Sequence, residues 1–236
     1  MAYRFGNSIV RDRLSLALDV ADPASYPGSG SSWFDLAQQL TFTSTGTQTP
    51  LATVGGVPCF TFNGSGYWSC GTNFQLVDFA GDCTLIMWLY DTDITTRRTL
   101  FQKNGTSYQP YEQEIAVTWE TNETISWYSR FSPAYDYAAT PALSLNAWKM
   151  VSIKMSTGKS STARTGFYSI NGSPWVANYT SNSSVAVVAA GAIVIGTGYA
   201  GTVGNGYIAG CYAYNKMLSD SEIKQNFEAH RWRFRV

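Results

Sequence analysis

The sequence predicts an all-β fold, a two-sheet antiparallel jelly-roll sandwich with one short C-terminal helix. About a dozen short stretches alternate apolar with polar residues or are apolar throughout, separated by turn residues. The stretch Leu85 to Leu89 is apolar at every position, which is typical of a central strand buried on both faces. No heptad pattern or internal repeat interrupts this organisation. With 236 residues, 44% of them hydrophobic, the chain can fill one sandwich core.

The beginning of the chain divides into two parts. Residues 1–13 are polar with spaced apolar residues and predict either an edge strand or an N-terminal arm reaching a neighbouring subunit. Residues 14–236 are expected to form the single domain. Its first strand covers Leu14 to Asp19, where leucines alternate with small residues, and a Pro/Gly-rich loop follows over 22–30.

The stretch Val57 to Cys70 predicts a β-hairpin with its turn over 63–66. In that register Cys59 faces Cys70 across adjacent strands. Despite this proximity, we expect all four cysteines to be free, structural thiols. They also lack the closely spaced pairs of a zinc site.

The middle of the chain continues the alternation of strands and turns. Two strands are expected within 113–129, a long loop over 130–141 and a further strand over 151–155. Asn-Gly at 171–172 predicts a tight hairpin turn. The apolar run 185–195 indicates two more strands joined near its middle.

The C-terminal part carries the clearest local signals. Tyr207 to Tyr214 is a predicted strand, and a helix is expected over 219–230, followed by a basic and aromatic tail. Ser219 and Glu222 form a capping box, and Leu218 and Ile223 occupy the positions of a hydrophobic staple. A helix this short requires a sheet to pack against.

These terminal segments resemble a known family. The stretch GYIAGCYAYNKMLSDSEIKQNF and the opening segment ADPASYPGSGSSWFDL are similar to segments of concanavalin A-like, laminin-G-like jelly rolls in phage and cyanophage virion proteins. The resemblance implies a non-enzymatic, lectin-like virion structural protein, assembled in the host cytoplasm, and we expect a capsid decoration or cement protein. The alternative is a tail or fibre module that recognises host-surface carbohydrate.

Composition restricts the partners. The formal net charge is zero, so the chain has no basic footprint for nucleic acid or an anionic membrane. No stretch is apolar enough for a signal peptide or a membrane span. The expected partners are other virion proteins of the capsid or tail and further copies of the chain in a homo-oligomer or symmetric array, with a host glycan in the alternative.

The sequence assigns no catalytic residue and no cofactor. Glycoside hydrolysis needs two carboxylates facing one cleft. Glu112 with Glu114 and Asp91 with Asp93 share faces, but both pairs lie at predicted strand ends and are interpreted as solvated. His230, the single histidine, is expected on the terminal helix. We interpret it as a cap of the helix end and not as part of a catalytic triad.

Calcium is the one metal that the resemblance brings into question, since many related jelly rolls bind it through loop Asp and Asn residues. Here Asp35 is followed by Leu-Ala-Gln-Gln-Leu, and Asn63 stands where an Asp is expected. These changes remove carboxylates that a hard cation needs, so no metal ligand is assigned.

Two groups of residues are candidate contact sites. An aromatic group, for carbohydrate or protein, comprises Trp127, Tyr128, Tyr135 and Tyr137, with Trp127 as a core residue in the alternative interpretation. A docking patch, rich in the Arg and aromatic residues common in interfaces, is expected where the two termini meet. Its members are Tyr3, Phe5, Arg11, Arg13, Arg231, Trp232, Arg233 and Arg235.

Overall fold

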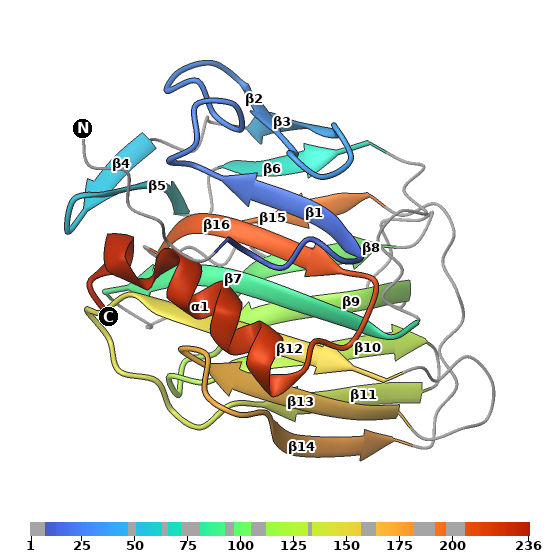
Figure 1. Ribbon diagram of the computed structural model, residues 1–236. Helices are drawn as coiled ribbons and strands as arrows, with labels where there is room; N and C mark the ends of the chain where they lie inside the picture. The colour runs from blue at the N-terminus through green and yellow to red at the C-terminus, as the bar shows by residue number, and fades with distance from the viewer. Residues whose placement is uncertain are drawn as a thin grey trace.

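The computed structural model describes residues 8–46, 51–62, 66–71, 81–92, 97–104, 112–131, 134–156, 164–181, 192–196 and 206–236. These residues form two antiparallel sheets packed face to face, with one helix outside them (Figure 1). The predicted fold class, an all-β sandwich with a C-terminal helix, is confirmed.

The first sheet, called sheet A here, has the helix on its outward face. In spatial order its strands are β14 (Val176–Ser181), β13 (Arg164–Ile170), β12 (Lys149–Met155), β7 (Cys83–Asp91), β16 (Gly206–Tyr214), β5 (Val57–Phe62) and β4 (Leu51–Val54). A further strand, β1 (Leu14–Asp19), pairs with the second half of β16, whereas β5 pairs with the first half. The predicted two-sided burial of β7 is confirmed, and the first and last strands of the chain are neighbours.

The second sheet, sheet B, lies behind sheet A in Figure 1. Its strands, again in spatial order, are β11 (Ala134–Ala139), β10 (Ile125–Phe131), β9 (Glu112–Trp119), β8 (Arg98–Asn104), β15 (Ile193–Ile195), β6 (Gly66–Cys70), β3 (Thr41–Gly46) and β2 (Ser32–Phe34). The main core lies between the two sheets. Aromatic rings from both sheets meet there edge to face, such as Trp33 against Phe60 at 5.0 Å between ring centroids.

The helix, α1 (Asp220–Phe234), covers the outward face of sheet A. The predicted capping box is present in full, because the Ser219 hydroxyl accepts from the Glu222 N–H and the Glu222 carboxylate accepts from the Ser219 N–H. Leu218 and Ile223 are buried as the staple predicts. The expected end at residue 230 is wrong. The helix continues to Phe234, whose ring stacks on Trp88 of β7 and holds the last turn against the sheet.

The predicted hairpin over 57–70 is also wrong. Its two strands exist as β5 and β6, but β5 belongs to sheet A and β6 to sheet B, so the chain crosses between layers. Cys59 therefore packs beneath α1 whereas Cys70 lies in the main core. All four cysteines are free, as expected, and buried.

The loop expected over 130–141 contains β11, which pairs with β10. Pro141 stands after the end of this strand, where a missing N–H costs no ladder hydrogen bond. The Asn-Gly turn is confirmed, with Asn171 and Gly172 at positive φ of 52° and 70°. Most of the run 185–195 lies outside the described residues, and its end forms β15.

Candidate interaction surface at the C-terminal helix

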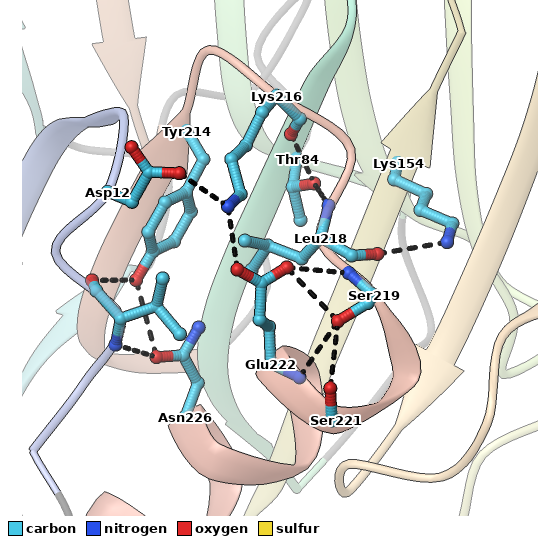
Figure 2. A network of polar contacts seen from close by, with 11 residues as sticks. Asp12, Thr84, Lys154, Tyr214, Lys216, Leu218, Ser219, Ser221, Glu222 and Asn226 are labelled. Atoms are coloured by element: carbon cyan, nitrogen blue, oxygen red, sulfur yellow. Dashed lines mark hydrogen bonds and ion pairs between the residues drawn. The ribbon is translucent and has the colours of Figure 1, made fainter.

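The first described residues of the chain lie directly on α1. Residues 8–13, called the arm here, run without strand or helix structure alongside the first half of α1. The backbone N–H of Val10 donates to Asn226 Oδ1 at 2.9 Å, and the Tyr214 hydroxyl donates to the Val10 carbonyl at 3.1 Å (Figure 2). Gln225 Nε2 donates to the Ser8 carbonyl at 2.8 Å. The two ends of the described chain are therefore packed together.

A charged network extends this contact to the helix start. Lys216 Nζ lies 2.8 Å from Asp12 Oδ2 and 2.6 Å from Glu222 Oε1 (Figure 2). The hydrogen bond to Asp12, reinforced by Glu222, raises the pKa of Lys216. The same lysine lowers the pKa of the Asp12 carboxyl. One lysine thus joins the arm to the carboxylate that caps α1.

A second network lies under the other end of α1. The Asp19 carboxylate accepts from Arg233 Nη1 at 2.9 Å and from the Tyr212 hydroxyl at 2.9 Å. His230 stacks on Tyr212, with ring centroids 5.2 Å apart. Burial, with the nearby Arg233 charge, lowers the pKa of His230 to about 4. His230 is therefore neutral near pH 7 and packs between aromatic rings instead of capping the helix end.

The structure divides the predicted docking patch. Arg231 and Trp232 are exposed on the last turn of α1 and Arg235 at its C-cap, and Trp232 is 57% exposed. Arg233 was expected as a free anchor, which is wrong, because its guanidinium is bound to Asp19 beneath the helix.

The remaining members of the patch lie elsewhere. Arg11 and Arg13 are exposed beside the start of α1, near Asn215, whose N–H donates to the Arg13 carbonyl. From Glu222 to Arg231 the helix rises about 14 Å, so the two groups of arginines lie at opposite ends of α1. Tyr3 and Phe5 lie outside the described residues.

A shallow groove of about 460 Å³ follows the exposed side of α1 beside the arm. It is lined by Ser8, Ser221, Lys224, Gln225 and Glu228. Its lining is polar and carries both signs of charge.

The aromatic candidate group loses one member. Trp127 is 2% exposed and pairs in register with Val117 and Ala138 in the main core, so it cannot contact a ligand. The alternative interpretation of Trp127 as a core residue is confirmed. Tyr128 is the Cα partner of Tyr137 across β10 and β11. Tyr135 lies in β11 and not in the predicted loop.

The carboxylates considered for catalysis or metal binding are placed as follows. Asp91 was expected to be solvated, but it is buried and its Oδ2 lies 2.5 Å from Arg98 Nη1, so that interpretation is wrong. The Asp35 carboxylate accepts three backbone N–H groups, from residues 17, 37 and 38, and is buried within its own loop. Glu112 and Glu114 lie in β9, and Asp93 lies outside the described residues. The described part of the chain contains no cluster of three His, Cys, Asp or Glu residues that could hold a metal.

Sequence reasoning missed Asp19, Lys216 and Asn226 as organising residues. Each makes at least one contact with a segment remote in the chain, such as Asp19 with Arg233, 214 residues away. A local signal existed only for Asn226, a polar residue on the buried side of the expected helix. The described residues include no helix long and apolar enough to cross a membrane.

Comparison with known proteins identifies the fold but no family. No family model and no curated protein matches the sequence. Among solved structures, Trypanosoma rangeli sialidase aligns over 94% of this chain and 33% of its own, at 16% identity and a TM-score of 0.64. The binding domain of botulinum neurotoxin serotype D aligns over 93% and 52%, at 16% identity and a TM-score of 0.64. That of botulinum neurotoxin DC, in complex with rat synaptotagmin II, aligns over 92% and 52%, at 12% identity and a TM-score of 0.68.

The chain thus spans about a third to a half of the length of these neighbours. At such low identity they establish a shared jelly-roll type β-sandwich and nothing further about this protein. Their own functions differ, one being an enzyme and the others binding domains of toxins.

Proposed function

We propose that this protein is a non-enzymatic structural component of a phage virion, a capsid decoration or cement protein that attaches through the last turn of α1. The observation that carries the proposal is the exposed Trp232 between Arg231 and Arg235. Trp and Arg are the residue types most enriched at the centres of protein interfaces. The opposite side of the same turn is anchored by Phe234 and Arg233, so the exposed group is held on a rigid support.

A structural role agrees with how the described acidic and basic side chains are used. Asp19, Asp91 and Glu222 are each engaged in ion pairs that join separate segments of the fold. His230 is buried against aromatic rings. These groups stabilise the sandwich and its helix, and they do not converge on an open cleft.

A receptor-binding module that recognises host-surface carbohydrate is the second candidate. It is favoured by the fold shared with toxin binding domains and with a sialidase solved in complex with sialic acid. Since Trp127 is in the core, Tyr128, Tyr135 and Tyr137 of β10 and β11 remain as its aromatic candidates.

Substitution on α1 separates these two functions. The triple variant Arg231→Glu, Trp232→Ala, Arg235→Glu should remain folded, because all three side chains are exposed. It should be absent from purified particles, while the control Lys224→Glu on the exposed side of the same helix should load normally. Full loading of the triple variant would refute attachment through this turn. Binding of the isolated protein to host glycans, lost in Tyr128→Ala and Tyr137→Ala, would favour the second candidate.

Deletion of residues 231–236 would not test attachment through this turn. Removal of 231–236 would take away Phe234 and Arg233, which are bound to Trp88 and Asp19. Loss of particle loading would then report unfolding of the helix end instead of a lost contact surface.

A further inference from the structure

We propose that the arm exchanges between copies of this protein, so that residues 8–13 of one molecule occupy on a second molecule the site that they occupy here on their own. The partner is a second copy of the chain. The proposal rests on the contacts of the arm alone and does not require the virion role proposed above.

The arm site is specific and is formed by one short part of the chain. Val10 is buried, with its N–H bound to Asn226 and its carbonyl bound to the Tyr214 hydroxyl. The Tyr214 hydroxyl also lies 3.3 Å from Asn226 Oδ1, so its single proton is shared between this oxygen and the Val10 carbonyl, and the two receptor side chains lie side by side. Every one of these receptor side chains belongs to residues 214–226, the segment from the end of β16 to the middle of α1.

Charge and side-chain contacts extend the site in both directions along the arm. Asp12 pairs with Lys216 at 2.8 Å on one side of Val10, and Ser8 accepts from Gln225 at 2.8 Å on the other. The site therefore selects an apolar residue whose backbone N–H and C=O are both bound, followed two positions later by a carboxylate. The arm of another copy supplies all of these features by identity, whereas an unrelated protein would have to reproduce each one.

The connection between the arm and β1 is a strained turn. The Leu14 N–H donates to the Arg11 carbonyl at 3.2 Å, and Arg13 adopts a φ of 60°, in the left-handed region. A residue with a Cβ is disfavoured there. Opening the turn into extended chain relieves the strain. Because Ser8, Val10 and Asp12 keep their contacts in either arrangement, exchange requires the start of β1 of one molecule to lie next to the arm site of the other.

Exchange keeps the contacts between the arm and its site, and it changes only the conformation of the turn at residues 11–14, called the hinge here. The closed monomer and the exchanged dimer contain the same arm contacts, so hinge strain and protein concentration decide between them. Strained hinges next to a docked terminal segment are the usual setting for domain swapping. A dense array of copies raises the local concentration and shifts the balance toward exchange.

Disulfide trapping between two different variants detects exchange directly. The variants Ser8→Cys and Gln225→Cys place thiols on two chains that meet only if the arm of one molecule lies on α1 of the other. The native cysteines are buried, and burial raises the pKa of Cys59 and of Cys70 to about 12, so they should stay unreactive under mild oxidation.

The two variants are refolded together at high concentration, oxidised and run on a non-reducing gel. A cross-linked dimer is expected, in an amount that increases with protein concentration. The control mixes Ser8→Cys with Thr43→Cys, which is exposed on sheet B and should give background only. Cross-linking of the first mixture no greater than that of the control overturns the proposal.

Substitution of the hinge gives a second test with opposite directions at one position. In the cysteine background, Arg13→Gly removes the strain of the closed turn and should lower the exchanged fraction by about fivefold per hinge. Arg13→Val adds β-branching at a positive φ and should raise it. If the two variants show equal exchange, the hinge does not control the arm and the proposal fails. Because Arg13→Gly suits the native turn, its result stands even where Arg13→Val folds poorly.

Discussion

Truncation of Phe234 is the sharpest test of how α1 is held to sheet A. The Phe234 side chain is 3% exposed, and its ring stacks on Trp88 with centroids 3.8 Å apart and planes 4° from parallel. Trp148 contacts the same ring from the side at 5.1 Å. The substitution Phe234→Ala therefore removes a buried ring between two indoles and leaves a cavity under the last helical turn.

The expected cost is about 3 kcal/mol of unfolding free energy, at the lower end for Phe→Ala because a helix end can partly collapse into the cavity. About 1 kcal/mol of this belongs to the lost aromatic stacking. For a domain of this size the melting temperature should fall by about 6–12 °C. Urea denaturation, followed by tryptophan fluorescence and by circular dichroism, measures the change at constant m-value.

Trp232→Ala is the matched control, since it removes a larger ring from the same turn at a position that is 57% exposed. Its effect should remain within about 0.5 kcal/mol. Equal losses for the two variants, or a loss below about 1 kcal/mol for Phe234→Ala, would show that the last turn is not docked on Trp88.

Three further perturbations test other contacts. Ser219→Ala should cost about 1 kcal/mol by breaking the capping box, measured by urea denaturation. The control is Lys224→Ala, at an exposed position of the same helix, and equal losses would refute the cap. Gly172→Ala should destabilise the fold by more than about 2 kcal/mol, because a Cβ there would lie 2.6 Å from the Phe227 Cβ. The control Gly28→Ala, at positive φ but in open space, should cost only about 1 kcal/mol. Similar losses for the two variants would contradict the close packing at Gly172. Since the pKa of His230 is about 4 when folded and about 6.5 when unfolded, the unfolded state binds the extra proton, so stability should fall by about 3 kcal/mol as pH drops from 6.5 to 4. His230→Gln should flatten that slope, and an unchanged slope would place the titration elsewhere.

Local codes were sufficient to predict the start of α1 and the Asn-Gly turn from the sequence. A capping box and a staple use residues within five positions of each other, so their geometry follows from backbone structure alone. The turn at Asn171 and Gly172 likewise depends on which residues tolerate positive φ. Burial of β7 on both faces was visible because its apolar residues do not alternate with polar ones.

The connection between β5 and β6 shows why pairing was not predictable. Two alternating apolar strands with a short connection fit a hairpin within one sheet, and they equally fit an arch that crosses from one sheet to the other. The residues that decide between these arrangements are remote, since β5 pairs with β16 and β6 pairs with β3 and β15. The same limit applies to Asp19, whose partner Arg233 lies at the opposite end of the sequence.

The burial of Arg233 within the predicted docking patch was missed for a different reason, which is the position of the helix end. Ending the helix at residue 230 left the residues after it without a defined orientation. Continued to Phe234, the helical period places Ile223, Phe227, His230 and Phe234 at spacings of four, three and four residues on the side facing sheet A. Trp232 must then face outward, because it lies two positions from Phe234, or about 200° around the helix. An aromatic residue held outward between two arginines, with the adjacent turn held on the sheet by Phe234, is therefore a direct consequence of the helix length.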